Sequence, residues 1–192
     1  MNRSLMFRLL LVAVGVIVLA GGAVIAMEPE LAKIHKRIAS DYKTVEHIDG
    51  TAFEALPESD VIVFDVREPE EFGVSHIKGA IQVDPGIKPE EFTERFSEAL
   101  NGKTIVFYCS VGRRSSLLAE RVDSVVAASG ANASYNLIGG IFQWHNEDRP
   151  LTNSTNVSTD SVHPYNSHWG RLIEDKSAIR YTPDNGALRN DN

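Results

Sequence analysis

Short apolar runs alternate with segments of helical periodicity through most of the chain, and this alternation constrains the fold more than any other feature. The runs VIVFD at 61–65 and TIVFY at 104–108 are unbroken, which is typical of strands covered on both faces. Residues 89–100 and 115–128 carry apolar side chains at helical spacing. The alternation therefore predicts an α/β fold, in which a parallel sheet of about five strands has helices on both faces.

The predicted elements follow one another without long gaps. We expect strands at 44–48, 61–65, 80–83, 104–108 and 134–138. We expect helices at 51–56, 69–73, 89–100, 115–128 and 141–146. These elements form one predicted domain at 44–152, after a polar spacer at 28–43 and before a polar linker and C-terminal tail at 153–192. We expect the tail to dock on the domain or to fray, with contact to a partner or a membrane surface as the alternative.

The N-terminus differs in kind from this domain. Residues 9–27 contain no charged side chain and follow Arg3 and Arg8. A helix of that length spans about 30 Å, close to the thickness of a bilayer core. Residues 1–27 are therefore predicted to be a signal peptide or a transmembrane anchor. An uncleaved segment would hold the domain at the membrane through residues 9–27 on the outer (periplasmic) side, whereas a cleaved one would leave the domain periplasmic or secreted.

Composition limits the partners and cofactors. The formal net charge of -7 argues against a nucleic-acid partner. Cys109 is the only cysteine, which excludes an internal disulfide framework, a zinc site built from several thiolates and a redox pair of cysteines. His163 and His168 lie in the polar linker with no cysteine nearby, and Pro164 breaks any helical spacing between them. No metal and no organic cofactor are expected.

Cys109 directly follows the apolar run TIVFY, and the next helix begins about five residues later. Ligands of parallel α/β sheets sit beyond the carboxyl ends of the strands, where this cysteine is placed. A free cysteine with a reference pKa of about 8.5 is only about 3% thiolate at pH 7. We expect the loop amides, the helix N-terminus and Arg113 or Arg114 to stabilise the thiolate, while Gly112 allows a tight turn.

Four motifs occur in a defined order along the domain. They are DVREPEEF at 65–72, SHIKGAI at 75–81, YCSVGRRS at 108–115 and LIGGIFQW at 137–144. In these motifs the chain resembles the single-domain rhodanese-like sulfurtransferases, which carry sulfur as a cysteine persulfide. The resemblance covers roughly residues 42–152. It implies the rhodanese-like fold and transfer of a sulfane sulfur from thiosulfate or a persulfide donor to a thiol or cyanide acceptor.

The resemblance also implies roles for individual residues. Cys109 would be the nucleophile that accepts sulfur, and Arg114 the catalytic arginine that closes its loop. The rest of the loop would bind the substrate, through Ser110, Val111, Gly112 and Arg113. Asp65 and Arg67 would be charged supports near the site. No metal enters the implied mechanism.

Two alternatives to a sulfurtransferase remain open from the residues. A non-catalytic module that senses sulfide or persulfide, or that binds a partner at the membrane, would keep the fold without turnover. A phosphatase or arsenate reductase of the cysteine-loop type is disfavoured because only four residues separate Cys109 from Arg114, which makes the loop small for a tetrahedral oxyanion. The acidic cluster Glu68, Glu70 and Glu71 is interpreted as a solvated helix face.

Overall fold

The computed structural model describes residues 16–18, 24–26 and 28–183. Within the N-terminal segment it describes two short strands, β1 (Val16–Val18) and β2 (Val24–Ala26), which pair antiparallel. Most of the predicted signal or anchor at 9–27 lies outside the described residues, so that segment stays a prediction. Among the helices of the described part, none combines the length and the apolar character needed to cross a bilayer.

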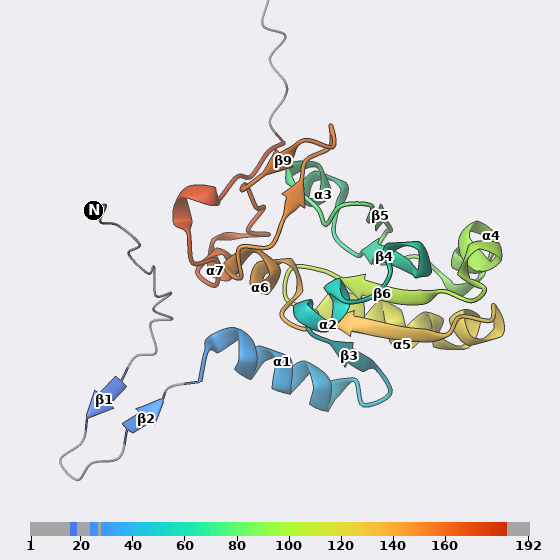
Figure 1. Ribbon diagram of the computed structural model, residues 1–192, viewed down its shortest axis with the longest axis horizontal. Helices are drawn as coiled ribbons and strands as arrows, with labels where there is room; N and C mark the ends of the chain where they lie inside the picture. Colours follow the sequence, from blue (N-terminus) through green and yellow to red (C-terminus); the bar gives the residue numbers. More distant parts are fainter. Residues whose placement is uncertain (1–15, 19–23, 27, 184–192) are drawn as a thin grey trace, which may run out of the picture.

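A five-stranded parallel sheet forms the centre of the molecule (Figure 1), as the alternation predicted. Its strands lie in the order β3-β7-β6-β4-β5, and every neighbouring pair is parallel. The bounds are β3 Glu46–Ile48, β4 Val61–Asp65, β5 Ile81–Gln82, β6 Thr104–Tyr108 and β7 Ala133–Leu137. The apolar run TIVFY forms the central strand, β6. Cys109, which follows it, therefore lies in the middle of the edge formed by the carboxyl ends of the strands.

Helices cover both faces of the sheet. They are α1 Glu30–Asp41, α2 Gly50–Glu54, α3 Pro69–Val74, α4 Pro89–Leu100, α5 Arg113–Ala128 and α6 Gly140–Asn146, with a 3-10 turn at Glu58–Asp60. Successive side chains of β6 enter opposite cores: Phe107 packs with α4 and α5, and Val106 packs with α1, α2 and α6. This is the two-residue period of a strand buried on both faces.

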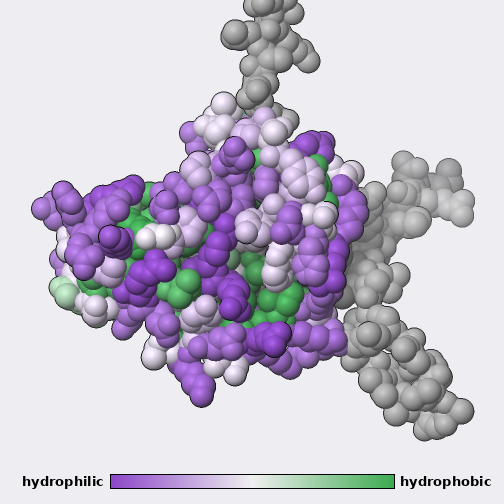
Figure 2. Space-filling view, turned by 180° about the vertical axis from the view of Figure 1, so that it is seen from behind, coloured by the Kyte–Doolittle hydropathy of each residue, from purple (hydrophilic) through white to green (hydrophobic). Residues whose placement is uncertain are grey.

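The core over α4 and α5 is rich in aromatic rings. Phe64 of β4 lies 5.3 Å from Phe92 of α4 and 5.3 Å from Phe107 of β6, measured between ring centroids. All three side chains are fully buried. Each such burial stabilises the fold by about 1.5–3 kcal/mol. Figure 2 shows one face of the molecule, which is mostly hydrophilic with smaller hydrophobic areas between the polar ones.

The chain beyond residue 150 continues over the α6 side of the sheet. Its elements are β8 Leu151–Thr152, β9 Ser158–Thr159, α7 Ser167–Gly170 and a 3-10 turn at Lys176–Ala178, with β8 and β9 paired antiparallel. Val162 and Ile173 are fully buried in the core that also holds α6. The side chain of Asn146 binds this segment twice, donating to the Leu172 carbonyl at 2.8 Å and accepting from the Glu174 amide at 2.9 Å. We call residues 160–183 the C-terminal segment, and it is docked on the domain.

Candidate active site

Cys109 occupies the carboxyl end of β6, and the loop that follows curls back toward its sulfur. The Gly112 amide donates to Sγ at 3.3 Å. Gly112 has a φ of 99°, in the left-handed region that side chains other than glycine rarely adopt, and it is the residue from which α5 starts. The 16-residue helix α5 thus begins two residues earlier than predicted and directs its N-terminus at the cysteine loop. Both features favour negative charge on the sulfur.

The start of α6 fixes the backbone of the same loop. The Ile141 amide donates to the Cys109 carbonyl at 2.9 Å, and the Phe142 amide donates to the Ser110 carbonyl at 3.1 Å. Gly140 makes this approach possible, because a Cβ atom there would collide with the Cys109 carbonyl oxygen. Gly140 of the motif LIGGIFQW therefore allows α6 to lie close to the cysteine loop.

A pocket of about 210 Å³ opens beside the cysteine. Its lining consists of Cys109, Ser110, Val111, Arg113, Arg114, Tyr165 and Trp169. The structure thus brings together five of the six loop residues proposed from the sequence, and Gly112 joins them through its amide. A larger hollow of about 570 Å³ lies between α4 and α5, but we place the site at the smaller pocket because it contains the nucleophile.

Arg114 is held by Glu71 across the mouth of the loop. Its Nη1 donates to Glu71 Oε2 at 2.7 Å and its Nη2 to Glu71 Oε1 at 2.8 Å, a bidentate pair. Ser110 joins it: Arg114 Nη2 donates to Ser110 Oγ at 2.9 Å, and Ser110 Oγ donates to Glu71 Oε1 at 3.1 Å. The arrangement ties α3, the cysteine loop and α5 to one another.

The interpretation of Glu71 as part of a solvated helix face was wrong. Its neighbours Glu68 and Glu70 are exposed, but Glu71 is only 2% exposed. Burial would raise the pKa of Glu71, yet the hydrogen bonds and charge of Arg114 outweigh it and lower this pKa. Burial would lower the pKa of Arg114, whereas the hydrogen bonds and the charge of Glu71 raise it. The pair is therefore ionised on both sides.

A second ion pair lies below the site and is fully buried. Arg67 donates from Nε to Asp65 Oδ1 at 2.8 Å and from Nη2 to Asp65 Oδ2 at 2.6 Å, and Nη2 also reaches the Ser75 carbonyl at 2.6 Å. The Tyr108 hydroxyl donates to Asp65 Oδ2 at 2.6 Å and accepts from the Ile77 amide at 3.1 Å. Burial and then the charge of Asp65 raise the pKa of Tyr108, so this donor keeps its proton.

This network joins two neighbouring strands at their carboxyl ends, because Asp65 pairs in register with Tyr108. Asp65 and Arg67 do not line the pocket that holds Cys109. Their link to the pocket is indirect, because Asp65 accepts a hydrogen bond from Tyr108, the residue immediately before Cys109. A buried pair of this kind is weak support for stability by itself, but removing one partner costs about 3–5 kcal/mol because the other charge stays buried.

Comparisons with known proteins show the family to which the chain belongs. The family model described as the rhodanese-like domain matches residues 37–147, which is more than half of the 192 residues. The chain belongs to the rhodanese-like domain family. The match starts inside α1 and ends just after α6, so the C-terminal segment lies outside it.

Named relatives of this rhodanese-like chain share low identity with it. The thiosulfate sulfurtransferase GlpE of Coxiella burnetii is 27% identical over 103 residues, covering 54% of this chain and 87% of the relative. The tRNA uridine(34) hydroxylase of Cytophaga hutchinsonii is 27% identical over 124 residues, covering 62% of this chain and only 38% of that protein. A solved thiosulfate sulfurtransferase of Pseudomonas aeruginosa is 17% identical with a TM-score of 0.48, over 64% of this chain and 23% of the other.

Within this rhodanese-like domain, the two arginines after the cysteine play different parts. Arg114 is committed to Glu71, whereas Arg113 is exposed and its Nη1 lies 3.5 Å from Asp41 Oδ2 at the end of α1. Both line the pocket. The positive charge offered to a bound anion therefore comes mainly from Arg113, with Arg114 already paired.

Sequence reasoning missed Glu71 and the aromatic pair Tyr165 and Trp169. Glu71 sits at the third position of α3, where its carboxylate also accepts from the Glu68 amide at 3.1 Å. The spacing of Glu68 and Glu71 at the start of a helix was a visible signal for the capping contact. It carried no information on Arg114. Trp169 lies at helical spacing with Leu172 and Ile173 in the sequence, but nothing in the sequence places it at the cysteine.

Proposed function

We propose that this chain is a sulfurtransferase that moves a sulfane sulfur from thiosulfate or an organic persulfide to a thiol or cyanide through a persulfide on Cys109. The observation that carries this proposal is the lone cysteine in a tight loop, with the Gly112 amide 3.3 Å from its sulfur and a pocket opening beside it. The membership of the family and the sulfurtransferase relatives support it.

The first half-reaction loads the cysteine. The Cys109 thiolate attacks the outer sulfur of the donor, the S–S bond of the donor breaks, and its remaining part leaves with the electron pair. Thiosulfate releases sulfite, and an organic persulfide releases a thiolate. The loop amide of Gly112 and the N-terminus of α5 stabilise the negative charge on sulfur before and after transfer. Arg113, on the rim of the pocket, attracts the anionic donor.

The second half-reaction removes the sulfur from Cys109. A thiolate or cyanide attacks the outer sulfur of the Cys109 persulfide, the S–S bond breaks, and the Cys109 thiolate returns as the leaving group. Arg114 and Glu71 do not exchange protons in this scheme, because both remain ionised. Their part is to hold the loop in the conformation that presents the sulfur.

A turnover assay tests this function and separates it from a sensor that loads once. The full chain is incubated with excess thiosulfate and cyanide, and thiocyanate is counted per protein molecule over time. A sulfurtransferase produces many thiocyanate molecules per chain at a steady rate. If no thiocyanate forms beyond the protein-free rate with both substrates in excess, the proposed function is wrong, and a chain that then still carries one added sulfur has the non-catalytic sensing function.

A further inference from the structure

The C-terminal segment supplies one wall of the cysteine pocket. Tyr165 and Trp169, which we call the aromatic wall, line the same space as Cys109. Both lie outside the part of the chain that matches the rhodanese-like domain. The pocket thus combines a loop inside the family match with a wall from residues outside that match.

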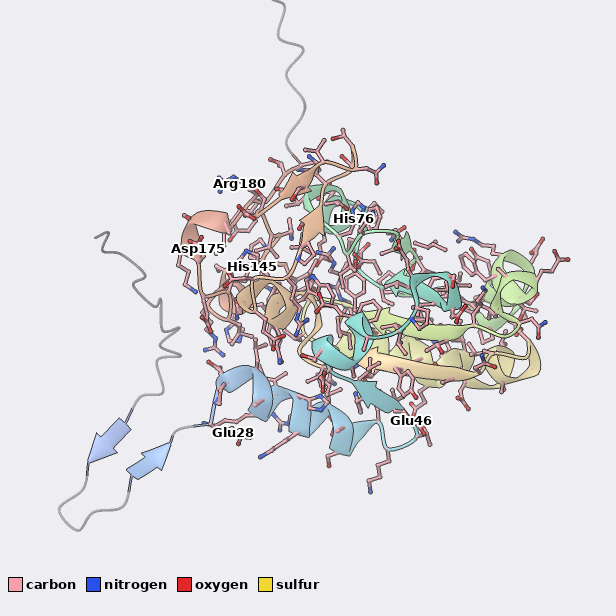
Figure 3. The ribbon with its side chains drawn as sticks, viewed as in Figure 1. Glu28, Glu46, His76, His145, Asp175 and Arg180 are labelled. Carbon is pink, nitrogen blue, oxygen red and sulfur yellow. The ribbon has the colours of Figure 1, made fainter. Side chains whose placement is uncertain are left out.

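Hydrogen bonds within the C-terminal segment and packing against the core hold the aromatic wall in place. The Asn166 side chain caps α7 by accepting from the Trp169 amide at 3.1 Å, and Trp169 packs against the core formed around α6. The Tyr165 amide donates to Nδ1 of the buried His163 at 3.0 Å. Figure 1 shows α7 beside α6, and Figure 3 shows His145 of α6 on the same side of the molecule as Asp175 of the C-terminal segment.

Tyr165 has the signs of a residue placed for a purpose other than packing. Its φ of 63° puts a large aromatic residue in the left-handed region, which is unfavourable for such side chains. The side chain stays 49% exposed, so burial does not compensate. The centre of its ring lies 4.9 Å from the Arg114 guanidinium carbon, and both residues line the pocket.

The charges around the pocket favour an organic group over a small dianion. The Arg114 charge is matched by Glu71 at 2.7 Å, and the exposed Arg113 lies near Asp41. An inorganic dianion such as thiosulfate would interact with the exposed Arg113 and would leave the aromatic faces unused. A small organic group would cover those faces, and the volume of about 210 Å³ suits a group of the size of one aromatic ring.

We infer that Tyr165 and Trp169 bind the organic group of a small organic persulfide donor, or of the matching thiol acceptor, and so determine the specificity of the site. This inference rests on the proposed sulfurtransferase function. In the step it concerns, the Cys109 thiolate attacks the terminal sulfur of R–S–SH and forms Cys109–S–SH. The donor S–S bond breaks, and R–S⁻ leaves against the aromatic wall. Charge and sulfur balance without any further reactant.

The test compares two donors on matched tyrosine variants of the full chain. Benzyl persulfide represents an organic donor and thiosulfate an inorganic one, and the rate constant for loading Cys109 is measured for each by intact mass. Tyr165→Ala is expected to lower the ratio of the benzyl persulfide constant to the thiosulfate constant about tenfold. Tyr165→Phe keeps the aromatic face and should restore loading. Tyr181→Ala is the control, because Tyr181 is 53% exposed on the same segment and does not line the pocket.

A binding measurement keeps this inference distinct from the proposed function. Benzyl methyl sulfide, which cannot transfer sulfur, is titrated against Cys109→Ser and against Cys109→Ser/Tyr165→Ala, with calorimetry as the readout. We expect affinity about tenfold weaker in the double variant. If neither donor loads Cys109 but this difference is found, the transfer function is wrong and the binding role of the wall stands. Equal affinity for the two proteins, or an equal loss of loading with both donors in Tyr165→Ala, overturns the inference.

Discussion

Replacing Cys109 with serine is expected to abolish sulfur transfer, with turnover falling by about a thousandfold or more. A hydroxyl group is a poor nucleophile at neutral pH and cannot carry the sulfane sulfur between donor and acceptor. The change removes little volume, and Gly112 can still donate to the new oxygen. The measurement is the rate of thiocyanate formation from thiosulfate and cyanide, with urea unfolding to establish that the variant is folded.

A relocated thiol provides the matched control for this variant. Ser124 lies on the exposed side of α5 and lines the larger hollow against α4. In Cys109→Ser/Ser124→Cys the chain again has one thiol, but without the loop amide and the helix N-terminus. We expect no recovery of turnover. Full activity in either variant would show that the transferred sulfur does not pass through Cys109.

Removal of the Glu71 carboxylate should destabilise the fold by about 3 kcal/mol at pH 7. Glu71→Ala leaves the Arg114 guanidinium, whose side chain is only 24% exposed, without its bidentate partner. It also removes the acceptor of the Ser110 hydroxyl. The measurement is the free energy of unfolding by urea. Glu70→Ala is the control, since Glu70 is exposed on the same helix and its loss should change stability by less than about 0.5 kcal/mol.

The stabilisation by Glu71 should depend on pH with a defined sign. Despite the opposing effect of burial, Arg114 lowers the pKa of Glu71 in the folded state. Its contribution is therefore complete above the unfolded value of about 4.3 and is lost as pH falls through the lower folded value. The difference in unfolding free energy between the natural chain and Glu71→Gln should shrink below about pH 4. A difference that grows in that range, or a Glu71→Ala chain as stable as Glu70→Ala, would contradict the buried pair.

The strands at the centre of the sheet were predictable because their own residues specify them. VIVFD and TIVFY became β4 and β6 with the predicted bounds, since an unbroken apolar run is stable only between two covered faces. The edge strands β3 and β5 are shorter than predicted. An edge strand has a neighbouring strand on one side only, so the residues at its ends find fewer backbone hydrogen-bond partners. The local sequence does not reveal which strands lie at the edge.

The cysteine loop was predictable for the same local reason, but its partners were not. The position of Cys109 after a buried strand and before a helix follows from the chain around it. The pairing of Arg114 with Glu71 depends on how α3 sits against the loop, 43 residues away in the chain. The place of Tyr165 depends on a still longer return of the C-terminal segment and on a left-handed backbone that no residue-type preference predicts for tyrosine.

The site of sulfur attachment is the central claim, and mass spectrometry tests it most directly. The folded full-length chain is incubated with thiosulfate without reductant, and its intact mass is measured before and after a brief exposure to cyanide. We predict a gain of one sulfur atom, located by peptide mapping on Cys109, and its complete loss to cyanide. A folded chain that gains no sulfur, or that carries it at any other residue, would contradict the account.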